Sequence, residues 1–284
     1  LTVDQQLAWE QVSQALQASQ SGALIPPILL HGVTGSGKTE IYLHATAQAL
    51  QQDRQVIVLV PEIAMTPQTV LRFLARFPGL VGLMHSRLSD GERYDTWRRA
   101  RQGQFGILVG PRSALFTPFP NLGLIIVDEC HDDSYYQSDV LPHYHAREAA
   151  VAYAKHCRAV CLLGSATPDL ESRYRAAQGK WTYIHLPERI LAHRQSVQSQ
   201  LAKLAVSGAV PLHSAYRPFS DLAETMELPA VHVVDMRQEL KAGNRSIFSR
   251  RLQESLQQVL EAGQQAILFL NRRGTATYVF CRAC

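Results

Sequence analysis

The feature that most constrains the fold of this 284-residue chain is a series of short, continuously apolar segments, each followed by a segment with helical spacing. The segments Val56–Val60 and Leu122–Val127 show no alternation of apolar and polar residues. Continuous apolar strands separated by helices are typical of a parallel sheet covered by helices on both faces. Residues 1–188 therefore predict one doubly wound α/β lobe. The expected strands are Ile28–His31, Val56–Val60, Leu80–His85, Phe105–Gly110, Leu122–Asp128 and Ala159–Gly164.

The rhythm of strands and helices breaks after Glu188. Residues 195–228 are rich in Ser, Ala and Gln and show no strand pattern, which predicts an irregular insertion over residues 189–229, with a short helix at 198–206. Order resumes with an expected strand at 230–236, a helix at 250–261 and a strand at 266–270. Residues 230–284 therefore predict the start of a second, truncated α/β lobe.

Composition excludes several classes of protein. With 46% hydrophobic and 18% charged residues, a disordered or fibrous chain is not expected. No apolar run approaches the roughly 20 residues that span a bilayer, and no leader peptide is visible, so we expect no membrane partner. Five cysteines, an odd number in a chain of this size, favour a reducing, cytoplasmic location. The net charge is only +4, but residues 235–284 hold eight basic and four acidic residues, which is compatible with either an anion-facing or a solvated surface.

A phosphate-binding loop is expected between the first strand and the following helix. The segment Gly32–Thr39 matches the pattern G-x-x-x-x-G-K-[ST] in the strand–loop–helix context that the motif requires. Its backbone N–H groups and the helix N-terminus favour bound phosphate, Lys38 can reach the β- and γ-phosphates, and Thr39 can hold Mg²⁺. The other expected nucleotide contacts of this loop are Gly32, Thr34, Gly35, Ser36 and Gly37.

An acidic pair follows the apolar strand that ends at Val127. Asp128 and Glu129 stand where parallel sheets bind ligands, and unpaired carboxylates there would cost desolvation energy. Asp128 can coordinate Mg²⁺, and Glu129 can orient or deprotonate an attacking water. His131 is either a structural histidine or part of this site, and Cys130 is expected to be a small buried thiol.

Two further patterns leave alternatives open. Ser165 and Thr167 follow the next strand, where they either link the nucleotide site to another surface or cap a helix that starts at Pro168. Cys281 and Cys284 have the spacing of Zn²⁺ ligands, but one pair cannot complete a tetrahedral site.

The order of these motifs resembles that of superfamily 2 helicases, and several connecting segments resemble the primosomal replication-restart helicases within that superfamily. These segments are Val60–Ile63, His85–Arg93, Gly110–Phe116, Val234–Arg237, Phe269–Gly274 and Cys281–Cys284. The resemblance implies a RecA-like P-loop NTPase fold and a 3′-to-5′ DNA helicase that uses ATP and Mg²⁺ to act in replication restart. It also implies single-stranded DNA-binding protein and primosome or helicase-loading proteins as partners, and Zn²⁺ sites that further cysteines would complete.

The resemblance assigns roles to further residues. Gln5 would read adenine, although the alternative is a simple helix cap; Arg112 and Ser113 would meet the DNA backbone. Residues 132–147 match an aromatic-rich loop that couples DNA binding to hydrolysis, in which Tyr135 and Tyr144 would either stack on bases or pack under the adjacent helix. The loop departs from the family pattern because Tyr136 and His143 stand where basic residues are expected.

Two other functions remain open from the sequence. One is a translocase that moves on duplex DNA without separating strands, and the other is a nucleotide-dependent assembly platform for replication proteins. In the family that the chain resembles, a complete second lobe supplies an arginine to the γ-phosphate. This chain holds only part of that lobe, so we expect the fragment alone to hydrolyse ATP slowly, if at all.

Overall fold

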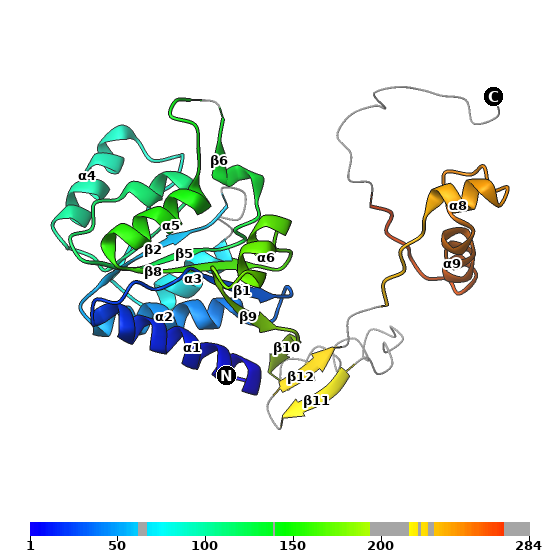
Figure 1. Ribbon diagram of the computed structural model, residues 1–284, viewed down its shortest axis with the longest axis horizontal. Coiled ribbons are helices and arrows are strands. Elements are labelled where there is room, and N and C mark those ends of the chain that lie inside the picture. The colour runs from blue at the N-terminus through cyan, green and yellow to red at the C-terminus, as the bar shows by residue number, and fades with distance from the viewer. Residues whose placement is uncertain (62–66, 139, 194–215, 221–222, 227–229, 270–284) are drawn as a thin grey trace. The chain divides into compact units, whose positions relative to one another are not determined.

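The computed structural model describes residues 1–61, 67–138, 140–193, 216–220, 223–226 and 230–269. The chain divides into two units, Leu1–Leu228 and Pro229–Cys284, and each is described by itself (Figure 1). The domain boundaries expected at residues 188 and 229 stay predictions. No helix of the described ranges is long and apolar enough to cross a membrane.

A seven-stranded sheet forms the centre of the first unit. Its strands run in the order β3-β4-β2-β5-β8-β1-β9, and every neighbouring pair is parallel. This confirms the predicted parallel α/β fold. The strands are β1 (Ile28–Gly32), β2 (Gln55–Leu59), β3 (Val81–Leu83), β4 (Ile107–Gly110), β5 (Leu122–Val127), β8 (Val160–Ser165) and β9 (Thr182–Leu186).

Helices cover both faces of this sheet (Figure 1). Val56 and Val58 of β2 belong to the core that α1, α2 and α3 complete, whereas Ile57 and Leu59 belong to the core on the opposite face, with residues of α4, η1 and α5. A strand that is buried on both faces must be apolar at every position, which explains the continuous runs in the sequence. The helices are α1 (Val3–Gln20), α2 (Lys38–Gln51), α3 (Pro67–Arg76), α4 (Asp90–Arg101), the 3₁₀ helix η1 (Arg112–Phe116), α5 (Ala146–Cys157) and α6 (Leu170–Ala177).

The segment between β5 and α5 contains a small hairpin. The 3₁₀ helix η2 (Asp133–Tyr135) leads into β6 (Tyr136–Gln137), which pairs antiparallel with β7 (Tyr144–His145). The aromatic-rich segment predicted from the sequence is therefore an ordered element that is anchored at the carboxyl end of β5.

The prediction of an irregular insertion after Glu188 is wrong for the described part of that segment. The strands β10 (Arg189–His193), β11 (Tyr216–Ser220) and β12 (Ala223–Met226) form an antiparallel sheet in the order β10-β12-β11. Both pairings contain a register irregularity, which disturbs the regular two-residue pattern on which a strand prediction depends. The helix expected at 198–206 lies outside the described residues.

The second unit contains α8 (Met236–Lys241) and α9 (Arg250–Glu261). The helix predicted at 250–261 agrees with α9, but the strands predicted at 230–236 and 266–270 are wrong as far as the structure describes them. Residues 230–235 and 264–269 form no strand, and Asp235 caps α8. Val233 and Ile267 are 96% and 95% exposed, so these apolar residues have no strand partner against which to pack.

Candidate functional site

The loop between β1 and α2 has the backbone shape of a phosphate-binding loop. Gly35 and Gly37 have φ angles of 83° and 86°, in the left-handed region that favours glycine. Gly37 is the N-cap of α2 and offers no side chain to its first turn, so the backbone N–H groups there remain available to an anion. Within the loop, Lys38 is buried and its Nζ donates to the carbonyl oxygen of Gly32 at 2.8 Å.

The acidic pair meets this loop at the carboxyl edge of the sheet. Lys38 Nζ lies 3.8 Å from Glu129 Oε1, although the two residues belong to strand–loop elements separated by β8. Glu129 has a φ of 46°, a strained conformation for a residue with a side chain, and such strain is often found at functional sites. The structure therefore brings together the cation and the carboxylates that the sequence predicted for one site.

Tyr42, which sequence reasoning missed, holds the other carboxylate. Its hydroxyl donates to Asp128 Oδ1 at 3.0 Å, and the tyrosine is fully buried. Gly164 makes this possible, because a Cβ atom there would lie 1.6 Å from the Tyr42 hydroxyl oxygen. The spacing offered a signal, since Tyr42 follows Lys38 by four residues and therefore lies on the same face of α2.

The electrostatics of the pair follow from this burial. Burial, followed by the neighbouring Glu129 carboxylate, raises the pKa of Asp128, although the Tyr42 hydrogen bond and Lys38 oppose the shift. Burial and the adjacent Asp128 charge raise the pKa of Tyr42 well above its ordinary value, so Tyr42 remains a hydrogen-bond donor. Burial also raises the pKa of the Cys130 thiol to about 12, as expected for an inert buried cysteine.

His131 connects the acidic pair to the end of β8. Its Nδ1 lies 2.7 Å from Ser165 Oγ and 3.7 Å from Glu129 Oε2. The backbone N–H of Thr167 also donates to Ser165 Oγ, at 3.0 Å. The capping alternative for this segment is wrong, because α6 begins at Leu170 and its N-cap is Asp169.

The helix-cap alternative for Gln5 is confirmed, and the same side chain also contacts the phosphate-binding loop. It forms a capping box with Thr2 at the start of α1, where its Oε1 accepts from the Thr2 backbone N–H at 2.9 Å. Its Nε2 donates to the Ser36 carbonyl oxygen at 3.0 Å, so the buried side chain also contacts the phosphate-binding loop. The predicted reading of adenine stays a prediction.

The predicted DNA-contacting residues lie around η1 and the β6–β7 hairpin. Arg112 donates through Nη1 to the carbonyl oxygen of Tyr136 at 2.7 Å, and Ser113 is exposed. Tyr144 is half-buried, with its ring edge-on to Phe116 at 5.4 Å between centroids.

Tyr135 is not available for base stacking: it is 1% exposed, and its hydroxyl donates to the Asp128 carbonyl oxygen at 2.7 Å. The packing alternative is therefore confirmed for Tyr135, because its ring belongs to the core beneath α5.

Arg147 is a second residue that sequence reasoning missed. Its guanidinium is buried between α5 and α6, where it donates to Glu148 Oε1 at 3.0 Å, to Ser172 Oγ at 3.1 Å and to the carboxylate of Asp169. Arg175 also donates to Glu148, at 2.7 Å. Because Asp169 and Ser172 lie more than 20 residues away in sequence, no local pattern could reveal this network.

The residues at this sheet edge fit a nucleotide with Mg²⁺. Ser36 Oγ is buried in the phosphate-binding loop without a hydrogen-bond partner, and a Cβ atom on Gly32 would lie 2.4 Å from it. Mg²⁺ is usually held by one or two protein side chains together with substrate phosphates, which is what Thr39 and Asp128 can offer. Within the described ranges, no group of three or more His, Cys, Asp or Glu side chains could hold a metal ion. Cys281 and Cys284 lie outside these ranges, so the Zn²⁺ site stays a prediction.

Comparison with known proteins gives one consistent result. The DEAD/DEAH box helicase family matches residues 2–175. The chain is 43% identical to the replication restart protein PriA of Bacillus subtilis over 284 residues, covering all of this chain and 31% of that protein. It is 47% identical to PriA of Synechocystis over 257 residues, covering 90% of this chain and 27% of that protein. The chain thus spans less than a third of the length of these two curated relatives.

Solved structures were found at lower similarity. The structure of RecG bound to a three-way DNA junction matches with a TM-score of 0.48 and 20% identity, covering 72% of this chain and 27% of that one.

Proposed function

The chain belongs to the DEAD/DEAH box helicase family, and from this premise we propose that it is the nucleotide-binding lobe of an ATP-dependent DNA helicase that acts in replication restart. Movement from 3′ to 5′, forked or single-stranded DNA as the substrate, and single-stranded DNA-binding protein and primosome or helicase-loading proteins as partners are parts of the same proposal. The family match and the PriA relatives support it.

The observation that carries the proposal is the convergence of Lys38 with the acidic pair. A buried lysine that lies 3.8 Å from Glu129, beside the unpartnered hydroxyl of Ser36, is a pre-arranged place for the phosphates of a nucleotide. Lys38 donates to its own loop at Gly32, and we propose that it exchanges this contact for the β- and γ-phosphates when ATP binds.

Each carboxylate then has a separate role in the proposal. Asp128, held by Tyr42, and Thr39 in the first turn of α2 would hold Mg²⁺. When bound, Mg²⁺ neutralises charge on the phosphates during their transfer. Glu129 would orient or deprotonate the attacking water, because its carboxylate lies 3.8 Å from Lys38 Nζ and therefore close to the expected position of the phosphates.

His131 and Ser165 extend the site toward the rest of the molecule. The His131–Ser165 hydrogen bond links the residues after β5 to those after β8. Because Glu129 lies 3.7 Å from the imidazole, a change in the position of Glu129 can alter this hydrogen bond. We propose that this pair transmits DNA binding to hydrolysis.

ATP hydrolysis by the full-length protein, with and without single-stranded or forked DNA, tests the proposal. We expect DNA to stimulate hydrolysis and Lys38→Ala to lower kcat by at least about a hundredfold, because a charge-stabilising donor to the phosphates is lost. Lys155→Ala, at an exposed lysine in the last turn of α5, is the matched control and should leave hydrolysis unchanged.

Hydrolysis that survives Lys38→Ala would refute the assigned site, and hydrolysis indifferent to DNA would refute the motor. Strand separation measured on forked DNA distinguishes a helicase from a translocase that moves on the duplex.

A further inference from the structure

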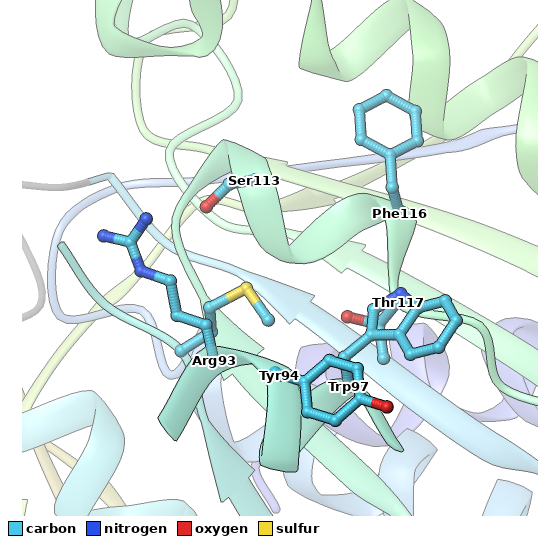
Figure 2. A pocket seen from close by; sticks show the side chains of 7 residues that line it. Arg93, Tyr94, Trp97, Ser113, Phe116 and Thr117 are labelled. Carbon is cyan, nitrogen blue, oxygen red and sulfur yellow. The ribbon is translucent and has the colours of Figure 1, made fainter. Parts of the chain in front are cut away.

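A hollow with exposed aromatic walls lies on the same side of the sheet as α5, between α4 and η1 (Figure 2). Its volume is about 320 Å³, within the range of small-ligand sites. Met84, Arg93, Tyr94, Trp97, Ser113 and Phe116 are among the residues that line it. We call this hollow the α4 pocket.

The exposure of its aromatic residues is unusual. Tyr94 is 63% exposed, Trp97 39% and Phe116 57%. A cluster of large exposed rings is an energetic cost that soluble surfaces mostly avoid unless the rings bind something. Tyr94 and Trp97 are three residues apart on α4, so their rings neighbour each other on one face of the helix, and Figure 2 shows both on the same side of the pocket. The ring of Phe116 points away from them in that view.

The charge around these rings is positive. Arg93 lines the pocket, and none of the residues that line it carries a carboxylate. The guanidinium of Arg101 lies 5.7 Å from the centre of the Trp97 ring. Aromatic faces together with arginines, with no carboxylate among the lining residues, suit a ligand that carries a flat ring and a negative charge.

The position of the pocket identifies the kind of ligand. Ser113, which lines it, follows Arg112 directly, and these are the two residues expected to meet the DNA backbone. Because Ser113 and the aromatic rings line the same pocket, a strand held there by its phosphates would carry its bases past the rings. Resting on the proposed function, we propose that the α4 pocket binds an unpaired base of single-stranded DNA, stacked on Trp97 and Tyr94, with Arg93 on an adjoining phosphate.

Such a site would not read sequence. Every base has a π-face on which an aromatic ring can stack, so the pocket would hold the strand without selecting it. A stacked base therefore adds affinity that depends on bases but not on which bases they are, and this distinguishes the α4 pocket from a contact to phosphate alone.

The experiment compares two probes of equal length: oligo-dT and an oligonucleotide of abasic sites, which keeps the phosphates but has no bases. With the full chain, we expect Tyr94→Ala/Trp97→Ala to weaken oligo-dT binding about tenfold, the size expected for one lost stacked base, and to leave binding of the abasic probe unchanged. Tyr174→Ala is the matched control, because Tyr174 is also 63% exposed but lies on α6. It should bind both probes as the unaltered chain does.

Intrinsic fluorescence gives a second readout that does not depend on the double variant. Oligo-dT should quench tryptophan emission in the unaltered chain, and Trp97→Phe should abolish this quenching while largely retaining affinity, because phenylalanine still stacks.

The outcomes separate this inference from the proposed function. Unchanged oligo-dT binding in Tyr94→Ala/Trp97→Ala, or equal loss for the abasic probe, overturns the pocket and leaves the helicase proposal standing. Absence of any DNA binding overturns both. Quenching of Trp97 by an acidic aromatic peptide but not by oligo-dT also overturns the inference and makes the pocket a protein-docking site.

Discussion

At the scale of single residues, the site depends on a tyrosine that no motif contains. Asp128 is half-buried in surroundings that disfavour its charged form, and the Tyr42 hydroxyl opposes that effect by donating to Oδ1. The absence of a side chain on Gly164 leaves space for the hydroxyl. Tyr42 is therefore expected to act on nucleotide binding through Asp128, without touching the nucleotide itself.

Tyr42→Phe tests this role. Removing a hydrogen bond to the carboxylate raises the pKa of Asp128 further above its ordinary value, because that bond favours the charged form. A carboxyl with a higher pKa is protonated over a wider acidic range, so the acidic limb of the ATPase pH profile should move to higher pH. Mg²⁺-dependent nucleotide binding should weaken about fivefold near neutral pH, for a loss of about 1 kcal/mol.

The control for this prediction makes the same chemical change elsewhere. Tyr153→Phe on α5 removes a half-buried hydroxyl that neighbours Cys157 and should leave the pH profile in place. An acidic limb that stays fixed in Tyr42→Phe would show that Tyr42 only fills space.

At the scale of elements, α5 and α6 are joined by the buried guanidinium of Arg147. Burial alone would raise the pKa of Asp169, but the hydrogen bonds that its carboxylate accepts from Ser172, together with the charge of Arg147, outweigh this effect and lower it. A carboxyl whose pKa is lowered by folding stabilises the fold above its unfolded pKa, and this contribution is lost as the pH falls through the folded value.

Asp169→Asn isolates that charge, because asparagine is also a good N-cap for α6. We expect the free energy of unfolding to fall by about 1 kcal/mol at pH 7, a figure that allows for the partial exposure of Asp169. The difference between variant and unaltered chain should disappear once the pH falls below the lowered pKa of the folded carboxyl, where Asp169 is protonated in both states. Asp95→Asn, at an exposed pair with Arg98 on α4, should change nothing measurable. Denaturant unfolding at several pH values measures both, and a loss that is independent of pH would contradict the assigned cause.

The same elements show what sequence can and cannot provide. The phosphate-binding loop and the acidic pair were predictable because each is a local pattern at the end of a strand, and parallel strands end at one edge. Tyr42 with Asp128, and Arg147 with Asp169, were not, because each pair is joined only by the packing of distant segments. The strands β10, β11 and β12 were missed and two strands near 230 and 266 were wrongly predicted for a related reason: a strand exists only where another segment pairs with it.

At the scale of the first unit as a whole, contacts connect the surface around η1 to the nucleotide site. Phe116 packs edge-on against Tyr144 of the hairpin, and Arg112 donates to the Tyr136 carbonyl oxygen. Tyr135 then donates to the Asp128 carbonyl oxygen. These contacts are a continuous physical route by which a strand bound near η1 can influence the acidic pair.

The strength of DNA binding should reflect phosphates more than bases. The net charge of +4 is modest, so affinity must come from local contacts rather than from the charge of the whole chain. Because neutralised phosphates release counterions, the logarithm of the affinity for single-stranded DNA should fall linearly with the logarithm of salt concentration, by about 0.7 for each phosphate contact. The affinity should vary little between sequences.

Arg112→Gln identifies one of those contacts. If Arg112 neutralises a phosphate, the variant should bind more weakly at low salt and its salt slope should be shallower by about 0.7. Arg76→Gln, at an exposed arginine of α3 that lies across the sheet from η1, should keep the slope of the unaltered chain. Fluorescence anisotropy of a labelled oligonucleotide over a salt series gives both numbers. Binding that ignores salt and selects a sequence would contradict a motor that tracks the backbone, since such a motor must hold every stretch of strand about equally well.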